Sequence, residues 1–192
     1  MKRTLTALTV AATMFASSAS AFDPEDLQKL KDTNECVECD LSKANLPPVT
    51  LLLGANLTGA NLTDANLEVA ILQGADLEGA DLEGADLYIA TLIGANLNNA
   101  NLTGANLERA LVDNATLNNA NLTRTNLTDA NLTGTNLTSA NLTGANLTGA
   151  NLTSANLTGA NLTSALLQYA TMNDAILCNT TMPDGSVIYS GC

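Results

Sequence analysis

The chain has 192 residues, with 19 Asp or Glu against 7 Lys or Arg, which gives a formal net charge of −12. It contains no His and no Trp, only 3% of its residues are aromatic, and its 46% of hydrophobic residues are mostly Leu and Ala. This composition excludes an ordinary core of interdigitated aromatic and β-branched side chains. It also excludes a histidine general base or metal ligand and argues against nucleic-acid binding by phosphate neutralisation.

Residues 1–21 have the layout of a secretory signal peptide. Lys2 and Arg3 form a basic start, a mildly apolar stretch follows over 5–16, and small residues lead to a cleavage site after Ala21. The apolar stretch is too short to span a bilayer as a helix. We therefore expect an exported and strongly acidic mature protein without stable membrane insertion.

Residues 22–35 predict a short helical cap, with the helix itself over 24–33. Asp23 is a suitable N-cap, Pro24 suits the first helical position, and two acidic residues follow in the first turn. Two leucines give this helix an apolar side. We expect that side to cover the beginning of the structure that follows.

Residues 36–50 predict a first-coil segment that contains a C-x-x-C pair, Cys36 and Cys39, and a shift of register. Leu46 and Leu57 are eleven residues apart, whereas the leucines that follow are separated by multiples of five. The Pro-Pro pair lies inside this longer interval. One inserted residue at a corner is the simplest explanation.

From residue 51 to residue 182, apolar residues recur with a period of five. Leu, or occasionally Val or Met, occupies 26 positions from Leu57 to Met182, and Ala usually stands two residues earlier. An α-helix would turn 140° net per unit and spread these leucines over every face, and a continuous strand would place them on alternating faces. A short extended Ala-x-Leu piece followed by a two-residue corner keeps them all inside a coil. The period therefore predicts an all-β solenoid.

The repeated sequence A(N/D)LxG, as at residues 145–149, resembles the pentapeptide-repeat protein family. The resemblance extends over nearly all of the chain after residue 35 and implies a right-handed, quadrilateral β-helix with twenty residues per coil. The sequences around Cys36 and after Cys178 also resemble the end motifs of exported cyanobacterial members. That resemblance implies the thylakoid lumen or the periplasm.

Residues 183–192 predict a C-terminal cap that begins with a Pro-Asp-Gly turn. If the solenoid is correct, the two cysteine pairs lie about 30 Å apart, and a disulfide requires Cα atoms within about 7 Å. We therefore expect a Cys178–Cys192 bridge at the C-terminal cap and a local Cys36–Cys39 bridge. Redox activity, zinc binding and free thiols remain as alternatives for the C-x-x-C pair.

The predicted outer surface is mostly Asn, Thr and Gly, and apolar residues interrupt it in one region. The twenty-residue register places six of them along one corner over three coils: Val69, Ile71, Tyr88, Ile89, Ile93 and Leu111. Exposed apolar clusters mark contact sites. We predict that this corner binds a protein partner, the alternative being that a terminal segment folds over it.

No pattern in the sequence indicates catalytic, cofactor-binding or metal-binding residues, so we expect a non-enzymatic structural or interaction module with no cofactor. One alternative is a redox-linked lumenal protein that uses the C-x-x-C pair. Another is an acidic mimic of DNA that binds gyrase, as some proteins of the resembled family do. Export and the arrangement of the acids in a belt around the axis argue against mimicry. The belt comprises Asp64, Glu68, Asp76, Glu78, Asp81, Glu83 and Asp86.

Overall fold

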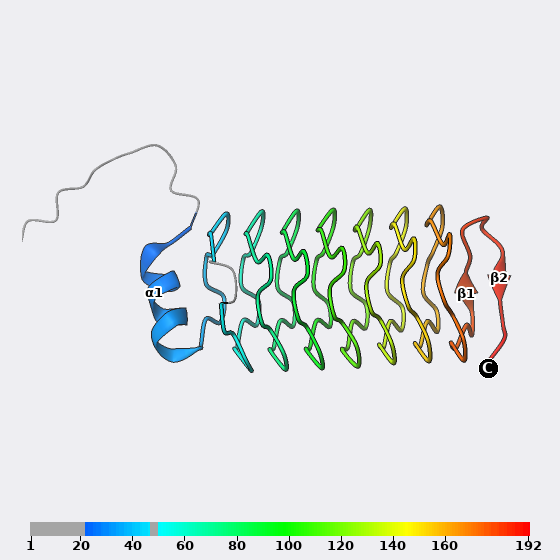
Figure 1. Cartoon of the computed structure of the whole chain (residues 1–192), viewed down its shortest axis with the longest axis horizontal. Coiled ribbons are helices and arrows are strands. Elements are labelled where there is room, and N and C mark those ends of the chain that lie inside the picture. Colours follow the sequence, from blue (N-terminus) through cyan, green and yellow to red (C-terminus); the bar gives the residue numbers. More distant parts are fainter. Residues whose placement is uncertain (1–21, 47–49) are drawn as a thin grey trace, which may run out of the picture.

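The fold is a stack of short coils with a helix at one end and a small hairpin at the other (Figure 1). The structure, a computed structural model, describes residues 22–46 and 50–192. Helix α1 spans Pro24–Thr33, and strands β1 (Thr180–Thr181) and β2 (Val187–Ile188) form the hairpin. The predicted signal peptide and the Pro-Pro pair of the predicted register shift lie outside the described residues.

Parallel β-bridges between successive coils define the repeat. From residue 51 onward, each bridge joins a residue to the residue twenty positions later, as from Asp76 to Asn96, and a bridge recurs every fifth residue. Twenty residues therefore form one coil, and neighbouring coils are about 4.8 Å apart. The separation is 21 for Asn45↔Asn66 and 20 for Leu51↔Ile71, so the interval before residue 51 accommodates one additional residue.

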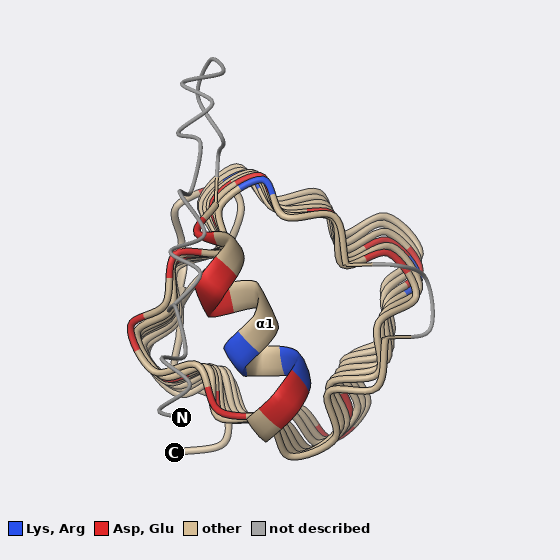
Figure 2. Cartoon of the chain, turned by 90° about the vertical axis from the view of Figure 1, so that its left-hand side faces the viewer, with Lys and Arg blue, Asp and Glu red and all other residues tan. Residues whose placement is uncertain are grey.

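A turn at the end of each five-residue unit produces the corners. The Ala N–H donates to the carbonyl of the preceding Leu, as from Ala100 to Leu97 at 3.2 Å. The residue just before that Ala has a left-handed backbone, with φ of 60° at Asn99 and 67° at Gly104. Gly and Asn tolerate this conformation better than other residues. Seen along the stack, the coils superimpose on an outline with four corners (Figure 2).

The interior consists of the Leu and Ala columns, which are 0–1% exposed through the middle of the stack. Thr replaces Ala at three buried positions, and each hydroxyl has a partner. Thr125 Oγ1 donates to the Leu102 carbonyl at 2.8 Å, and Thr180 Oγ1 donates to the Leu157 carbonyl at 2.7 Å. Because the hydroxyl is satisfied, Thr is tolerated in this apolar column.

Helix α1 lies across the N-terminal end of the stack (Figures 1 and 2). Asp23 caps it by accepting a hydrogen bond from the Glu25 amide at 2.8 Å, and the Asn34 amide closes it on the Leu30 carbonyl. Leu30 is 2% exposed. The helix therefore packs its apolar side on the first coil.

Candidate interaction surface

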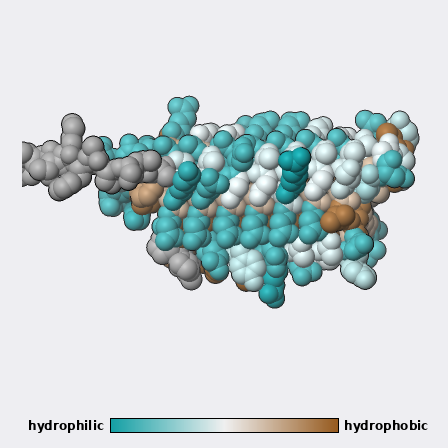
Figure 3. Space-filling view, turned by 90° about the horizontal axis from the view of Figure 1, so that it is seen from above, coloured by the Kyte–Doolittle hydropathy of each residue, from teal (hydrophilic) through white to brown (hydrophobic). Residues whose placement is uncertain are grey.

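The outward side chains of most coils form polar ladders that satisfy one another. Thr123 Oγ1 donates to Asn121 Oδ1 in the same unit at 2.6 Å, and Asn121 Nδ2 donates to Thr103 Oγ1 of the preceding coil at 2.8 Å. Figure 3 shows such a hydrophilic row along one side of the stack. The Asn and Thr side chains of these Asn-Leu-Thr units therefore stabilise the fold, because they hydrogen-bond one coil to the next.

The six predicted contact residues lie on one corner and the side that follows it, over three coils. Bridges place Ile71, Thr91 and Leu111 in one column. Ile89 and Leu111 are exposed, at 37% and 41%, and the other four predicted residues are half-buried. The structure thus brings all six together, and Thr91 stands among them.

Two more apolar residues extend this surface toward the N-terminal end and were not part of the prediction. Leu51 pairs with Ile71, and Leu53 stands one coil before Gln73. They are more exposed than any of the six, at 65% and 51%. Applying the twenty-residue register backward from residues 71 and 73 would have found them. We call the whole set the apolar face: Leu51, Leu53, Val69, Ile71, Tyr88, Ile89, Ile93 and Leu111.

The backbone of the apolar face is strained at two stacked corners. Val69 and Ile89 have φ of 58° and 56°, and they are the only β-branched residues with positive φ in the described chain. A β-branched side chain in the left-handed region costs on the order of 1–2 kcal/mol. Gly, Asn, Asp or Ser stands at most equivalent corners. Val69 and Ile89 are therefore conformationally unfavourable at these corners, whereas most equivalent corners carry residues that adopt a positive φ at lower cost.

Carboxylates border the apolar face. Glu68 and Glu108 stand one coil below and above Tyr88 in the same column. Asp113 stands one coil after Ile93 in the same column. Its Oδ1 accepts a hydrogen bond from Asn131 Nδ2 at 2.9 Å. Its Oδ2 is buried and has no hydrogen-bond partner among the described residues. The surface thus combines apolar side chains with bordering carboxylates and with one exposed cation, Arg109, which stands one coil after Ile89 in the same column.

The acidic belt takes part in the polar ladders. Asp76 and Asp81 each accept a hydrogen bond from the Asn side chain of the next coil at 2.9 Å. Each also accepts from a backbone amide two residues later, at 3.1 and 3.2 Å. Asp76, Asp81 and Asp86 occupy successive sides of one coil. These three carboxylates therefore run around three sides of the stack and not along its axis.

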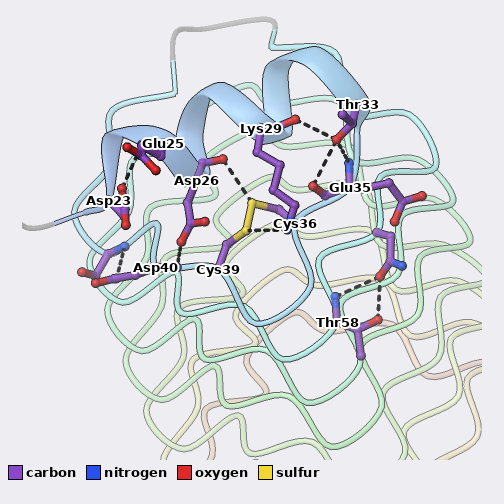
Figure 4. Close-up of a disulfide and its surroundings, with 12 residues drawn as sticks. Asp23, Glu25, Asp26, Lys29, Thr33, Glu35, Cys36, Cys39, Asp40 and Thr58 are labelled. Carbon is purple, nitrogen blue, oxygen red and sulfur yellow. Dashed lines mark hydrogen bonds between the residues drawn. A yellow bond between two sulfur atoms is a disulfide. The ribbon is translucent and has the colours of Figure 1, made fainter. Parts of the chain in front are cut away.

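The N-terminal disulfide is sealed inside the first coil beneath α1 (Figure 4). Cys36 and Cys39 occupy a Leu and an Ala position of the repeat, and they are 0% and 2% exposed. Asp26 and Lys29 of α1 cover the bridge, with the Asp26 carbonyl oxygen 3.3 Å from Cys36 Sγ. Asp26 and the two cysteines are close enough to hold a metal ion. The bridge, however, uses both sulfurs.

The C-terminal disulfide joins Cys178 to Cys192 and holds the tail against the last coil. Cys192 is exposed and Cys178 is half-buried, unlike the N-terminal pair. In the hairpin turn, the Ser186 hydroxyl and amide donate to Asp184 and lower the pKa of that carboxyl. Both bridges agree with the pairing expected from the sequence, and disulfides are typical of oxidising compartments.

Comparison with known proteins identifies the family. The family model for pentapeptide repeats matches eight copies, over residues 51–88, 90–119, 105–144 and 145–182. The chain therefore belongs to the pentapeptide-repeat family, whose fold is a right-handed β-helix. Members of this class are structural and interaction modules. A search of curated proteins finds no match.

Solved structures support the fold. HetL, a pentapeptide repeat protein involved in heterocyst differentiation regulation in the cyanobacterium Nostoc, is 36% identical over 77% of this chain and 76% of its own, with a TM-score of 0.61. QnrB1, a plasmid-mediated fluoroquinolone resistance protein, is 24% identical over 82% of this chain and 79% of its own, with a TM-score of 0.54. At that identity QnrB1 supports the fold alone. Among residues 22–46 and 50–192, no helix is long and apolar enough to cross a membrane.

Proposed function

We propose that the chain is a non-enzymatic interaction module that binds a protein partner through its apolar face. The main observation in support is the backbone strain at two residues of that face, Val69 and Ile89. Strained residues of this kind cluster at functional sites. The same corner farther along the stack carries Asp129 and Gly149, so the fold itself does not need a β-branched residue there.

The described terminal segments leave the apolar face uncovered. Helix α1 lies on the N-terminal end of the stack, and β2 pairs with β1 at the other end (Figure 1). Leu51, Ile89 and Leu111 retain 37–65% of their accessible surface. Grouped apolar exposure of this kind favours a separate partner over a terminal segment of the same chain.

We further propose that the protein works in an exported, oxidising compartment, either the thylakoid lumen or the periplasm. The predicted signal peptide and two disulfides with no free cysteine in the described chain support this. In this proposal α1 with the Cys36–Cys39 bridge closes one end of a quadrilateral β-helix. Closure of the end coil prevents strand addition there.

The two alternatives have less support. A redox function for Cys36 and Cys39 requires access to sulfurs that are at most 2% exposed. Zinc binding would require that bridge to be reduced. Mimicry of DNA requires negative charge along the axis, whereas Asp76, Asp81 and Asp86 lie on successive sides of a single coil.

A double substitution tests the proposal with residues that the fold already uses. Ile93→Thr with Leu111→Asn introduces the side chains found one or two coils later in the same columns. Wild type, this variant and an Asn151→Thr control would be immobilised and exposed to an extract of the native compartment. We expect wild type and control to retain the same partner, and the double variant to lose it at an unchanged melting temperature. Retention by the double variant would overturn the proposal.

A further inference from the structure

One side of the stack carries a tyrosine between two glutamates. Tyr88 belongs to the apolar face, and Glu68 and Glu108 stand one coil before and one coil after it in the same column. The bridges of Asp86 with the coils before and after it fix this register. Neighbouring members of the column are therefore about 4.8 Å apart along the stack. We call these three residues the tyrosine column.

The side chains of the tyrosine column are half-buried, and its carboxylates have no cationic partner. Glu78, which holds the same repeat position on another side, is exposed. Within the described chain, neither Glu68 nor Glu108 forms an ion pair, although Glu108 accepts a hydrogen bond from Asn126 Nδ2 at 3.3 Å. Water screens a half-buried carboxylate less than an exposed one, so its attraction to an opposite charge is stronger. The column therefore offers two such carboxylates without a cation from the described chain.

The immediate surroundings of the tyrosine are negative. On its side of the stack and the two adjoining corners, the charged residues within one coil of it are four carboxylates and one cation: Asp64, Glu68, Asp86, Glu108 and Arg109. Lys43 and Arg124 are two coils away, at the far corner, and the axial distance of about 10 Å exceeds the Debye length at physiological salt. Arg109 follows Glu108 directly, so the more negative half of the tyrosine column is the half toward Glu68.

We propose that the tyrosine column binds an arginine side chain of the partner, and that the rest of the apolar face binds the apolar residues beside that arginine. This inference rests on the proposed function and specifies the chemistry of the partner. A guanidinium stacks on an aromatic ring, and the carboxylates on either side of the ring accept its hydrogen bonds. Ile89, Ile93 and Leu111 all lie on one side of the column. The apolar residues of the partner therefore lie on one side of its arginine.

Arg109 gives the contact a sign that an experiment can measure. It is exposed, stands one coil after Ile89 in the corner column, and forms no ion pair in the described chain. A cation bound against Tyr88 is attracted by Glu68 and repelled by Arg109. Removing one of these two charges should therefore weaken the contact and removing the other should strengthen it. An acidic partner would show the reverse order, and a purely apolar partner would respond to neither change.

Fluorotyrosine NMR with short peptides tests the proposal on the purified exported chain. The sequence has three tyrosines, so Tyr169 and Tyr189, near the C-terminal end, serve as internal references for Tyr88. The peptide acetyl-Leu-Leu-Arg-amide would be titrated beside the same peptide with Gln in place of Arg. We expect a saturable shift of the Tyr88 resonance alone, with an affinity for the Arg peptide at least about threefold higher than for the Gln peptide. Equal affinities, or no shift at Tyr88, would overturn the proposal.

Three charge substitutions separate this inference from the proposed function. Glu68→Gln should weaken binding of the Arg peptide and capture of the native partner about threefold, and Arg109→Gln should strengthen both. Glu78→Gln removes the same charge on another side of the stack and, as the matched control, should change neither. If Ile93→Thr with Leu111→Asn abolishes capture while the charge substitutions have no effect, the arginine contact is refuted and the proposed function stands. Stronger capture by Glu68→Gln would indicate an acidic partner and would also overturn the inference.

Discussion

Leu102→Ala is the perturbation whose cost follows most directly from the coil geometry. Leu102 is 0% exposed and lies between Leu82 and Leu122 in one interior column. Its amide donates to the Asn121 carbonyl of the next coil at 2.7 Å, and similar backbone hydrogen bonds join the neighbouring coils around it. The backbone therefore cannot close around the missing side chain. We expect a cost of about 3–5 kcal/mol, the upper part of the range for Leu→Ala.

Equilibrium urea denaturation of the purified protein, followed by circular dichroism, measures this cost. Leu177→Ala is the matched control, because Leu177 holds the same repeat position in the last coil but is only partly buried. We expect about 1–2 kcal/mol for the control, since water already reaches that site. A cost below about 1 kcal/mol at Leu102, or equal costs at both sites, would refute a continuous interior column.

Three further predictions address the interior, the corner and the bridges. Thr125→Val should lower the free energy of unfolding by about 1 kcal/mol, because one buried hydrogen bond is lost, and urea denaturation with no measurable loss would contradict this. Ile89→Asn should change the free energy of unfolding by less than about 1 kcal/mol, because relief of left-handed backbone strain offsets the lost burial. The same substitution should weaken capture of the partner. A sharp fall in the melting temperature would contradict this prediction. Under a mild dithiol reductant, mass spectrometry of alkylated protein should find the exposed bridge at Cys192 opened before the buried bridge at Cys36, and the opposite order would refute the difference in access.

The coil could be predicted because one local rule repeats along the chain. A five-residue period of Leu and Ala has only one compact solution, and the bridges twenty residues apart agree with it. The six residues of the predicted corner lie together for the same reason. Leu51 and Leu53 escaped prediction because they adjoin the interval with the additional residue, where the register is hardest to extend.

The backbone strain at Val69 and Ile89 and the partial covering of the last coil could not be predicted from the period. The pattern specifies which side chain points inward, but it does not specify the backbone conformation that Val69 and Ile89 must adopt. The sequence also predicted a cap over 183–192 from its turn and its cysteine. How much of the last coil that tail covers depends on its path, which leaves Met172 and its neighbours partly exposed.

Site-specific photo-crosslinking tests most directly whether the apolar face contacts a partner. A photoreactive amino acid would replace Ile93 or Thr153, which stand three coils apart in the same column with the same orientation. On illumination in the native compartment, the account predicts a discrete crosslinked product from position 93 and none from position 153. Equal products from both positions, or a product from position 153 alone, would contradict it.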